Sequence, residues 1–339
     1  MPRLLAAPDK YRGTLSAREA AAAIEAAAAA AGWDCDIAPV SDGGEGFLEV
    51  FADFGSRRTA RVSGPLGQEI EVPWVLGHDD DDPSRGVAIV ESALAIGLTT
   101  IGGAARNDPM RASTTGLGQV VAAATRAGAK QVLIGMGGSA TTDGGLGAVD
   151  VLAPNGRRPA AELLVACDVE TQFLDAAAIF SPQKGAAPAQ VELLKRRLER
   201  VAQLYEERFG VDVRSIKGSG AAGGLGGGLV AIGAKLVPGF DLVAEKLSLA
   251  ERVAAADLVV TGEGYLDKQS FAGKAVGGVA RLAQQAGVPV LVIAGDGEPG
   301  APIPFVSMVD RYGRARSFDD PAPCITEVVA ERLGSDRAG

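Results

Sequence analysis

Apolar residues at the two ends of the chain form short runs, separated by stretches with a helical period. Leu4 to Ala7 is a short apolar run typical of a buried strand. Ser16 and Glu19 are spaced as in a capping box, and the Ala-rich stretch after them predicts a helix that ends at Gly32. Residues 36–40 predict a second strand. Together these elements predict one β-α-β unit.

The pattern changes to alternation in the next part of the chain. Residues 59–62 and 69–76 alternate between apolar and polar positions and flank the turn sequence 63–67, which predicts a β-hairpin. Residues 86–91 form another apolar run that predicts a strand. Because antiparallel strands interrupt the β-α-β pattern, we expect a second domain to begin here.

Strands and helices alternate again over the rest of the chain. Pro188 suits the first turn of a helix, which we expect to run to Phe209. Further elements are predicted at 114–127, 131–134, 163–168, 256–260, 276–286, 288–294 and 305–309, followed by a C-terminal helix.

These elements predict an α/β protein with two α/β domains. We expect the C-terminal alternation to complete the N-terminal β-α-β unit, so that residues 1–60 and 237–339 form one Rossmann-like domain. Residues 61–236 would then form an inserted α/β domain with a mixed sheet.

Composition excludes several classes of function. The 339 residues carry a net charge of −9, which argues against a nucleic-acid-binding surface. Three widely spaced cysteines indicate neither a zinc site nor a disulfide framework, and they fit a reducing cytoplasm. The one histidine, His78, borders an acidic loop, which excludes a Ser-His-Asp triad and a multi-histidine metal site. The N-terminal apolar run is too short for a signal peptide, and the uncharged segment 218–234 is too rich in glycine for a membrane-spanning helix.

Five turns carry the candidate chemistry; four of them combine glycine with carboxylate or hydroxyl residues, and the first contains Asp9 and Lys10. Glycine lets a backbone approach a ligand and point N–H groups at it, and a neighbouring carboxylate can bind a divalent metal or accept a proton. Sites for phosphate, metal and proton are what a phosphoryl-transfer enzyme needs. The turns span residues 7–10, 41–46, 135–145, 218–224 and 261–264.

Three acidic residues near the N-terminus have two interpretations each. Asp9 stands at the end of a predicted strand, where open α/β sheets bind ligands, but a turn residue that accepts from nearby amides explains it equally well. Asp42 and Glu45 lie three apart in a Gly-rich turn and are candidate Mg²⁺ ligands. For Glu45, a stabilising charge at the start of the next helix is the slightly better interpretation.

Two segments match part of a dinucleotide-binding fingerprint. Residues 135–140 follow a predicted strand, and the hydroxyls and Asp143 nearby suit phosphate and metal better than a pyrophosphate alone. Close packing of a helix on a strand is the alternative explanation for these glycines. Residues 218–223 have the same spacing without a clear strand before them. A Walker A sequence is absent, so a nucleotide-binding kinase would need another architecture.

Two carboxylates follow the strongly apolar run 256–260. Asp267 or Glu263 is placed to accept a proton from a substrate hydroxyl. Lys274 is a candidate phosphate ligand, although an exposed lysine at the start of a helix is the commoner situation.

The order of these motifs along the chain resembles that of the glycerate kinase family of the bacterial glycerate 2-kinase type. The resemblance runs from Ala7 to about Ala294. It rests on APDKYRGT at 7–14, DGGEG at 42–46, SGPLG at 63–67, GGSATTDGG at 137–145, ACDV at 166–169, PQKGA at 182–186, GAAGGLG at 220–226 and TGEG-x-x-D-x-Q at 261–269. So many blocks in one order make the resemblance specific.

The resemblance implies two α/β domains with a cleft between them, and phosphorylation of D-glycerate to 2-phosphoglycerate with ATP and Mg²⁺. On that basis we predict the following roles. The catalytic candidates are Asp267, our first choice as base, then Asp9, Glu263, Lys10 and Arg12. The nucleotide candidates are Gly137, Gly138, Ser139, Thr141, Gly220, Gly223, Gly224 and Lys274. The substrate candidates are Asp42, Gly43, Gly44, Glu45 and Lys184, and the metal candidates are Asp168 and Asp143.

Departures from the family pattern leave the exact acid open. Tyr11 and Arg12 stand where the family usually has a lysine, and residues 170–175 replace a common Asn-Pro-Leu and a Gly-rich turn. A kinase for a related small hydroxy acid, an NAD-dependent dehydrogenase and a non-catalytic sensor of a small acid or nucleotide are the alternatives. We expect a cytoplasmic monomer or homodimer that binds neither nucleic acid nor membrane. The sequence leaves open which hydroxyl is phosphorylated and which carboxylates bind the metal.

Overall fold

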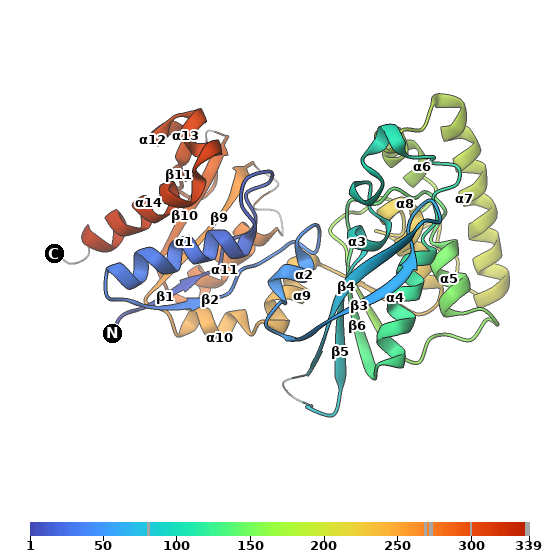
Figure 1. The fold of residues 1–339 in the computed structure, drawn as a ribbon, viewed down its shortest axis with the longest axis horizontal. Helices are drawn as coiled ribbons and strands as arrows, with labels where there is room; N and C mark the ends of the chain where they lie inside the picture. Colours follow the sequence, from blue (N-terminus) through green and yellow to red (C-terminus); the bar gives the residue numbers. More distant parts are fainter. Residues whose placement is uncertain (80–81, 268–269, 271–273, 299, 336–339) are drawn as a thin grey trace. The chain divides into compact units, whose positions relative to one another are not determined.

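The computed structural model of the chain describes residues 1–79, 82–267, 270, 274–298 and 300–335. It divides into two compact units, both visible in Figure 1. Unit 1 consists of Met1–Asp42 and Phe240–Gly339, and unit 2 consists of Gly43–Gly239. Each unit contains its own sheet with helices packed on it, which confirms the predicted α/β class.

The chain passes from unit 1 to unit 2 earlier than the sequence pattern predicts. Strand β3 (Gly55–Ser63) pairs with β4 (Glu69–His78) along its whole length, from Gly55 opposite Gly77 to Ser63 opposite Glu69. This hairpin belongs to the sheet of unit 2, so the boundary must lie before Gly55. The units divide at 42/43 rather than 60/61. The return to unit 1 comes at 239/240 rather than 236/237.

Unit 1 is built on a parallel five-stranded sheet with the strand order β11-β10-β9-β1-β2. Its elements are β1 (Arg3–Ala6), α1 (Ala17–Ala30), β2 (Asp34–Ile37), α9 (Gly239–Lys246), α10 (Leu249–Ala254), β9 (Leu258–Leu266), α11 (Ala275–Ala286), β10 (Val290–Gly297), β11 (Val306–Ser307), α12 (Met308–Tyr312), α13 (Arg314–Asp319) and α14 (Pro321–Ser335).

Helices cover both faces of this sheet. The connection β1-α1-β2 runs toward one edge and β9-α11-β10 toward the other, and since such crossovers are right-handed, α1 and α11 lie on opposite faces. The packing of successive residues in β10 is consistent with helices on opposite faces. Ile293 packs in the cluster that contains the apolar faces of α1 and α14, whereas Val292 and Ala294 pack with Val276 of α11.

Local signals in the sequence explain where α1 begins. Ser16 accepts a hydrogen bond from the backbone N–H of Glu19, and the Glu19 carboxylate accepts from the backbone N–H of Ser16. This reciprocal pair is the predicted capping box, and it satisfies two donors that the first turn leaves free.

Unit 2 is built on a six-stranded mixed sheet with the strand order β3-β4-β5-β6-β7-β8, in which β3 and β4 are antiparallel and β5 to β8 are parallel. Its other elements are α2 (Phe47–Val50), β5 (Gly86–Glu91), α3 (Ser92–Ile96), η1 (Thr99–Ile101), η2 (Ala104–Arg106), α4 (Thr115–Arg126), β6 (Ala129–Gly135), α5 (Leu146–Leu152), β7 (Glu162–Ala166), α6 (Ala176–Phe180), η3 (Pro182–Lys184), α7 (Pro188–Phe209), α8 (Ala221–Ala231) and β8 (Lys235–Val237).

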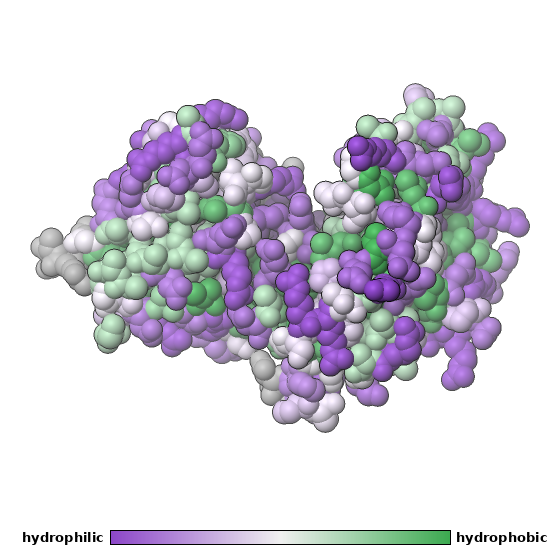
Figure 2. Space-filling model, in the orientation of Figure 1, coloured by the Kyte–Doolittle hydropathy of each residue, from purple (hydrophilic) through white to green (hydrophobic). Residues whose placement is uncertain are grey.

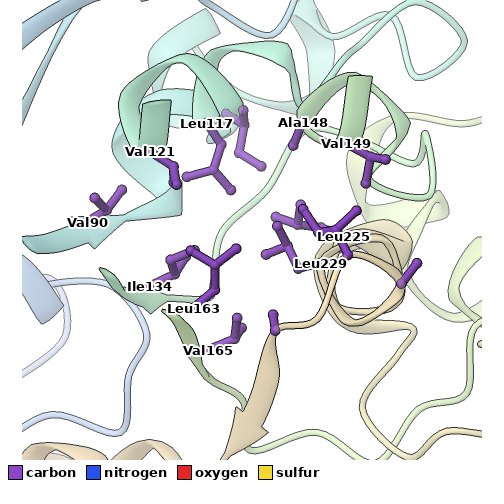
Figure 3. Packing of buried hydrophobic residues seen from close by; sticks show 14 of the residues in the cluster. Val90, Leu117, Val121, Ile134, Ala148, Val149, Leu163, Val165, Leu225 and Leu229 are labelled. Carbon is purple, nitrogen blue, oxygen red and sulfur yellow. The ribbon is translucent and has the colours of Figure 1, made fainter. Parts of the chain in front are cut away.

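The core of unit 2 lies between the parallel strands and the helices α4, α5 and α8. Figure 3 shows Ile134 of β6 and Leu163 of β7 pointing toward Leu117 of α4, with Leu225 and Leu229 of α8 beside them. The long helix α7 begins at Pro188 and ends at Phe209, as the sequence predicts. Within the described residues, every helix is too short or too polar to span a bilayer.

Candidate active site

The strand order of unit 1 reverses between β1 and β9, which gives the carboxyl ends of these two strands a special position. One crossover leaves β1 toward β2, and the other leaves β9 toward β10. In open α/β sheets, ligands bind outside the carboxyl ends of the strands at such a reversal. The residues there are Asp9, after β1, and Glu263, in β9.

A cavity of about 490 Å³ lies at this point of unit 1. It is large enough for a nucleotide or another small molecule, and charged residues of both signs line it. The lining residues include Asp9, Lys10, Arg12, Asp42, Glu263, Tyr265, Asp267, Lys274, Asp296, Met308, Arg314, Ser317 and Phe318. Seven of these residues are site candidates predicted from the sequence, and the structure brings those seven together in one pocket.

Asp9 is held by the backbone of the neighbouring strand. Its N–H donates to the carbonyl oxygen of Gly262 at 2.9 Å, and its carboxylate accepts from the N–H of Lys10 at 2.7 Å. The residue is only 7 % exposed. Burial raises the pKa of Asp9 to about 6, although the Lys10 ammonium opposes this rise. Asp9 is therefore a carboxyl group whose proton exchanges close to neutral pH.

Lys10 lies between two carboxylates of the same pocket. Its Nζ is 3.7 Å from an oxygen of Asp9 and 3.9 Å from an oxygen of Asp42. These distances allow the ammonium to compensate both charges without a tight contact to either, so Lys10 retains N–H groups that can reach a ligand.

Glu263 is the second carboxyl group with a perturbed pKa in this pocket. Its Oε1 atom is buried and has no hydrogen-bond partner among the described residues. Burial raises the pKa of Glu263 to about 7, and the nearby Asp9 carboxylate adds to the rise. A buried carboxylate oxygen without a partner in a cavity is suited to bind a proton, a metal ion or a donor group of a ligand.

The segment around Glu263 is a strand rather than the predicted turn. β9 continues to Leu266, and it pairs with β10 as far as Gly297. Its glycines are needed for close packing, since a Cβ on Gly262 would lie 1.9 Å from the carbonyl oxygen of Ile293. A Cβ on Gly264 would lie 2.9 Å from the N atom of Arg12.

Asp267, the first choice as base, lines the pocket but also anchors a local turn. Its carboxylate accepts hydrogen bonds from the N–H and the hydroxyl of Ser270, at 2.8 and 3.2 Å. Lys274 occupies the N-cap position of α11 without a side-chain capping bond and is half-buried, and Arg12 is exposed; both line the pocket. The predicted TGEG-x-x-D-x-Q block ends outside the described residues, at 268–269.

Unit 2 has a smaller cavity, of about 200 Å³, at the carboxyl ends of β6 and β7. Among the predicted residues it is lined by Gly137, Gly138, Ser139, Asp168 and Lys184. Its other lining residues are Leu98, Met136, Cys167, Val169, Phe180, Gln183, Ala221 and Ala222.

Lys184 supplies a buried positive charge to this cavity. The residue is 3 % exposed, and its Nζ donates to the Ser139 hydroxyl at 2.9 Å and to the carbonyl oxygen of Thr141 at 2.6 Å. Among the described residues, no carboxylate lies within ion-pair distance of it. Burial lowers the pKa of Lys184 to about 7. The Asp143 carboxylate opposes this lowering without contacting the ammonium, and a buried ammonium with a third N–H makes this cavity a candidate anion site.

Asp143, a predicted metal ligand, has its oxygens occupied by protein donors. They accept from the N–H and the hydroxyl of Thr114, both at 2.8 Å, and from the N–H groups of Gly145 and Gly147, at 3.0 and 3.2 Å. The carboxylate thereby joins the starts of α4 and α5. This favours an anchoring role for Asp143, and the metal role stays a prediction.

The two Gly-rich loops of unit 2 pack on each other. A Cβ on Gly223 would lie 2.0 Å from the carbonyl oxygen of Thr141, and one on Gly224 would lie 2.7 Å from the Cα of Gly144. Gly220 likewise has no room, because a Cβ would lie 2.4 Å from the carbonyl oxygen of Gln172. These glycines are explained by packing, and they do not line the cavity.

The loop after β6 also differs from a dinucleotide-binding turn. The next helix, α5, begins only at Leu146, six residues after the end of the 135–140 match. The N–H of Gly137 donates to the hydroxyl of Ser92 at 3.3 Å. The loop therefore lacks the helix N-terminus on which such a fingerprint places a pyrophosphate, which removes the basis for the dehydrogenase alternative.

The predicted substrate residues 42–45 fall on the division between the two units. Asp42 belongs to unit 1 and lines its pocket, whereas Gly43, Gly44 and Glu45 belong to unit 2 and line neither cavity. Glu45 is exposed.

The structure adds Glu91, for which the sequence pattern predicts only a place at the end of a strand. It is buried, and its carboxylate accepts from the N–H groups of Gly46 and Leu48 at 3.1 and 3.0 Å. It fixes the turn that follows the 42–45 segment.

Neither cavity contains a preformed metal cage. Across the described residues, no three His, Cys, Asp or Glu side chains are placed to hold a metal ion together. Asp168 is an exposed carboxylate at the unit 2 cavity and accepts from the N–H of Gly239 at 2.7 Å. Mg²⁺ commonly binds one or two carboxylates together with phosphates of the substrate, so a complete cage is not required.

Comparisons with known proteins agree with one another. The model of the glycerate kinase family matches residues 4–155 and 149–306. A glycerate kinase of Halalkalibacterium halodurans is 38 % identical over 331 residues, covering 87 % of this chain and 86 % of that protein. A glycerate 2-kinase of Escherichia coli is 36 % identical over 329 residues, covering 86 % and 85 %. A solved structure described as glycerate kinase 2 from Salmonella typhimurium superposes with a TM-score of 0.84 and 32 % identity, covering 100 % and 99 %.

Proposed function

The chain belongs to the glycerate kinase family, and we propose that it transfers the terminal phosphoryl group of ATP to a hydroxyl of D-glycerate, giving 2-phosphoglycerate. As a member of this family it is a phosphotransferase with an alcohol group as acceptor. The new bond joins the alcohol oxygen to phosphorus, the bond from phosphorus to the ADP oxygen breaks, and the hydroxyl proton must go to an acceptor.

The observation that carries this proposal is the Asp9 carboxyl group in the unit 1 pocket. It lies at the strand reversal and is buried, and its pKa of about 6 leaves it largely ionised at neutral pH but still basic enough to accept a proton. We place it ahead of Asp267, whose carboxylate already accepts two hydrogen bonds from Ser270. Lys10, Arg12 and Lys274 line the same pocket and offer positive charge to the phosphoryl oxygens.

We propose the same pocket as the site of a magnesium ion. Glu263 offers a buried oxygen without a partner, and Asp9 and Asp42 are the neighbouring carboxylates. Glu263 and Asp42 would hold the ion together with phosphate oxygens, which leaves Asp9 to accept the proton. When bound, Mg²⁺ would neutralise negative charge on the phosphates, while the residues of the chain orient the phosphates and accept the proton.

Lys184 in unit 2 is proposed as an anion ligand for the carboxylate of the acid or for a phosphate of ATP. Its buried ammonium and the Ser139 hydroxyl are the groups that would bind the anion. A cytoplasmic location is part of the proposal, since the donor and acceptor are metabolites of that compartment.

The proposal is tested by ADP release from purified protein with ATP and Mg²⁺, with D-glycerate, L-glycerate, tartronate or no acid. We expect release that depends on D-glycerate. Product added to enolase without phosphoglycerate mutase should yield phosphoenolpyruvate, which identifies the phosphorylated hydroxyl. Release with tartronate alone would assign a different hydroxy acid, and no release with any of these acids would overturn the proposal.

A further inference from the structure

One end of the unit 1 pocket has a chemical character that the transfer of a phosphoryl group to a small acid does not require. Asp9 follows β1, whereas Arg314 and Phe318 belong to α13, which follows β11. In the strand order β1-β9-β10-β11, three spacings separate β1 from β11, or roughly 14 Å at about 4.8 Å each. The pocket therefore extends from a carboxylate-rich end to an aromatic and cationic end.

Exposed aromatic rings are concentrated at this pocket. Among the described residues, the exposed large hydrophobic side chains are Met1, Val169, Ile179, Leu193, Tyr265 and Phe318. The two aromatic ones, Tyr265 at 52 % and Phe318 at 45 % exposure, both line this cavity. Figure 2 shows a largely hydrophilic surface around α12 and α13. Rings kept in contact with water beside a cavity offer a flat apolar face to a ligand.

Arg314 differs from the other arginines of its segment. Arg311 pairs with Glu331 and Arg316 with Glu327, whereas no carboxylate lies within ion-pair distance of Arg314 among the described residues. Its guanidinium carbon lies 4.7 Å from the centroid of the Phe318 ring. Arg314 and Phe318 thus form a pair in which both π surface and positive charge remain available to a ligand.

Given the proposed kinase function, on which this inference rests, we infer that the Arg314–Phe318 end of the pocket binds the purine ring of the nucleoside triphosphate. The purine stacks on the Phe318 ring beside the Arg314 guanidinium, and the phosphate chain extends toward Lys10 and Lys274. A three-carbon hydroxy acid has no π face to use such a surface, whereas every nucleobase does.

The concave shape favours a small molecule over a protein partner. Phe318 and Tyr265 line a cavity of about 490 Å³ that also contains carboxylates and lysines, and such mixed cavities are typical of nucleotide and cofactor sites. The family match ends at residue 306, before α13, so this end of the pocket lies outside the matched residues.

The test measures ATP binding and turnover separately in the full chain. Phe318→Ala and Phe318→Leu should each raise the Kd of ATP, by calorimetry without acid, about tenfold, in the range measured for loss of one stacked base. Phe318→Trp should retain wild-type affinity, because it restores an aromatic face. Arg314→Met should weaken ATP binding in the same direction. The KM of D-glycerate should stay unchanged in all four variants.

Arg316→Met is the matched control, since Arg316 is on the same helix, lies 4.7 Å from the Tyr312 ring and does not line the pocket. Inorganic tripolyphosphate, which lacks a base, should compete with ATP equally well in the wild type and in Phe318→Ala.

An unchanged Kd of ATP in Phe318→Ala would overturn the inference, as would an equal weakening of ATP and tripolyphosphate binding. A wild type that binds ATP but phosphorylates no acid would overturn the proposed function alone, because the calorimetric comparison needs no turnover. Thermal melting of each variant separates loss of stacking from loss of folding, and Phe318→Leu keeps most of the apolar volume if Phe318→Ala is unstable.

Discussion

Replacing Lys184 with methionine removes the buried ammonium of unit 2 while keeping most of its volume. The substitution also removes the hydrogen bonds to the Ser139 hydroxyl and the Thr141 carbonyl oxygen. It therefore tests whether the lysine is a structural support of the fold or a charge kept at a cost for binding an anion.

The expected effect of Lys184 on the free energy of unfolding follows from its pKa. Its lowering from 10.5 to about 7 corresponds to roughly 5 kcal/mol against the charged form in the folded protein. The folded pKa lies below the unfolded one, so between these values the unfolded chain holds a proton that the native chain does not. The free energy of unfolding of the wild type then rises with pH, by about 1.4 kcal/mol per pH unit at most.

The methionine variant lacks this pH dependence. Between about pH 7 and pH 9 the wild type should gain roughly 2 kcal/mol of stability relative to the variant. Near pH 7 the two proteins should have similar stability, because removing the buried charge offsets the lost hydrogen bonds, each of which costs about 1–3 kcal/mol when its partner stays buried.

Urea unfolding followed by tryptophan fluorescence measures this difference. The chain has two tryptophans, Trp33 in unit 1 and Trp74 in the core of unit 2, so a Trp33→Phe background makes the signal report on unit 2. Lys195→Met is the control, because Lys195 lies at the surface of α7 and pairs with Glu192. The same pH dependence in wild type and Lys184→Met would refute the argument that burial without an ion pair lowers the pKa of Lys184.

Binding of an anionic substrate should offset the free-energy cost of burying the Lys184 ammonium. An anion at Lys184 stabilises the ammonium, so the ligand that binds there should raise the pKa of Lys184 and reduce the pH dependence of wild-type stability. Lys184→Met should raise the KM of that ligand alone. A rise for D-glycerate would assign the site to the carboxylate, and a rise for ATP would assign it to a phosphate.

Three further predictions follow from the structure. Asp9→Asn should lower kcat by about a hundredfold or more with little change in KM. The wild-type kcat/KM should rise as pH increases through about 6, because Asp9 must be ionised to accept a proton. Asp267→Asn should lower kcat less than about tenfold, and a larger loss of kcat in Asp267→Asn than in Asp9→Asn would assign the base to Asp267. Gly262→Ala should destabilise unit 1 by about 3 kcal/mol, because its Cβ would collide with the Ile293 carbonyl oxygen, and near-wild-type urea unfolding would contradict this. Asp143→Asn should destabilise unit 2 by about 2 kcal/mol through lost hydrogen bonds, whereas unchanged stability with a raised requirement for Mg²⁺ would restore the metal role.

Elements with local signals were predictable from the sequence. The capping box of Ser16 and Glu19 fixes the start of α1, and Pro188 fixes the start of α7. The glycines of 261–264 show the limit of such signals. Glycine is common both in turns and where strands pack closely, and here the pairing of β9 with β10 decides between the two. That pairing is a long-range property, which no local window contains.

The candidate site was predictable only in part, because some of its residues are brought together by long-range packing. Asp9 and Glu263 were found because the carboxyl ends of parallel strands gather at one edge of a sheet. Arg314 and Phe318 belong to no motif, and only the packing of α13 brings them to the pocket. The burial of Lys184 and the bonds of Glu91 to the backbone depend on the whole of unit 2 and could not be read from neighbouring residues.

The division of unit 1 into two segments sets the order in which the chain can fold. The interior strand β1 is made early, but its neighbour β9, the central strand of the sheet, leaves the ribosome only after the whole of unit 2. Closing a flexible loop of roughly 200 residues would cost roughly 5 kcal/mol in entropy. The two ends of unit 2 meet, since a Cβ on Gly43 would lie 3.2 Å from the Cα of Gly239, so folding of unit 2 before β9 pairs with β1 would remove most of that cost. Mutations that slow the folding of unit 2 should therefore delay the pairing of β1 with β9, so that during synthesis β1 is paired with β2 alone.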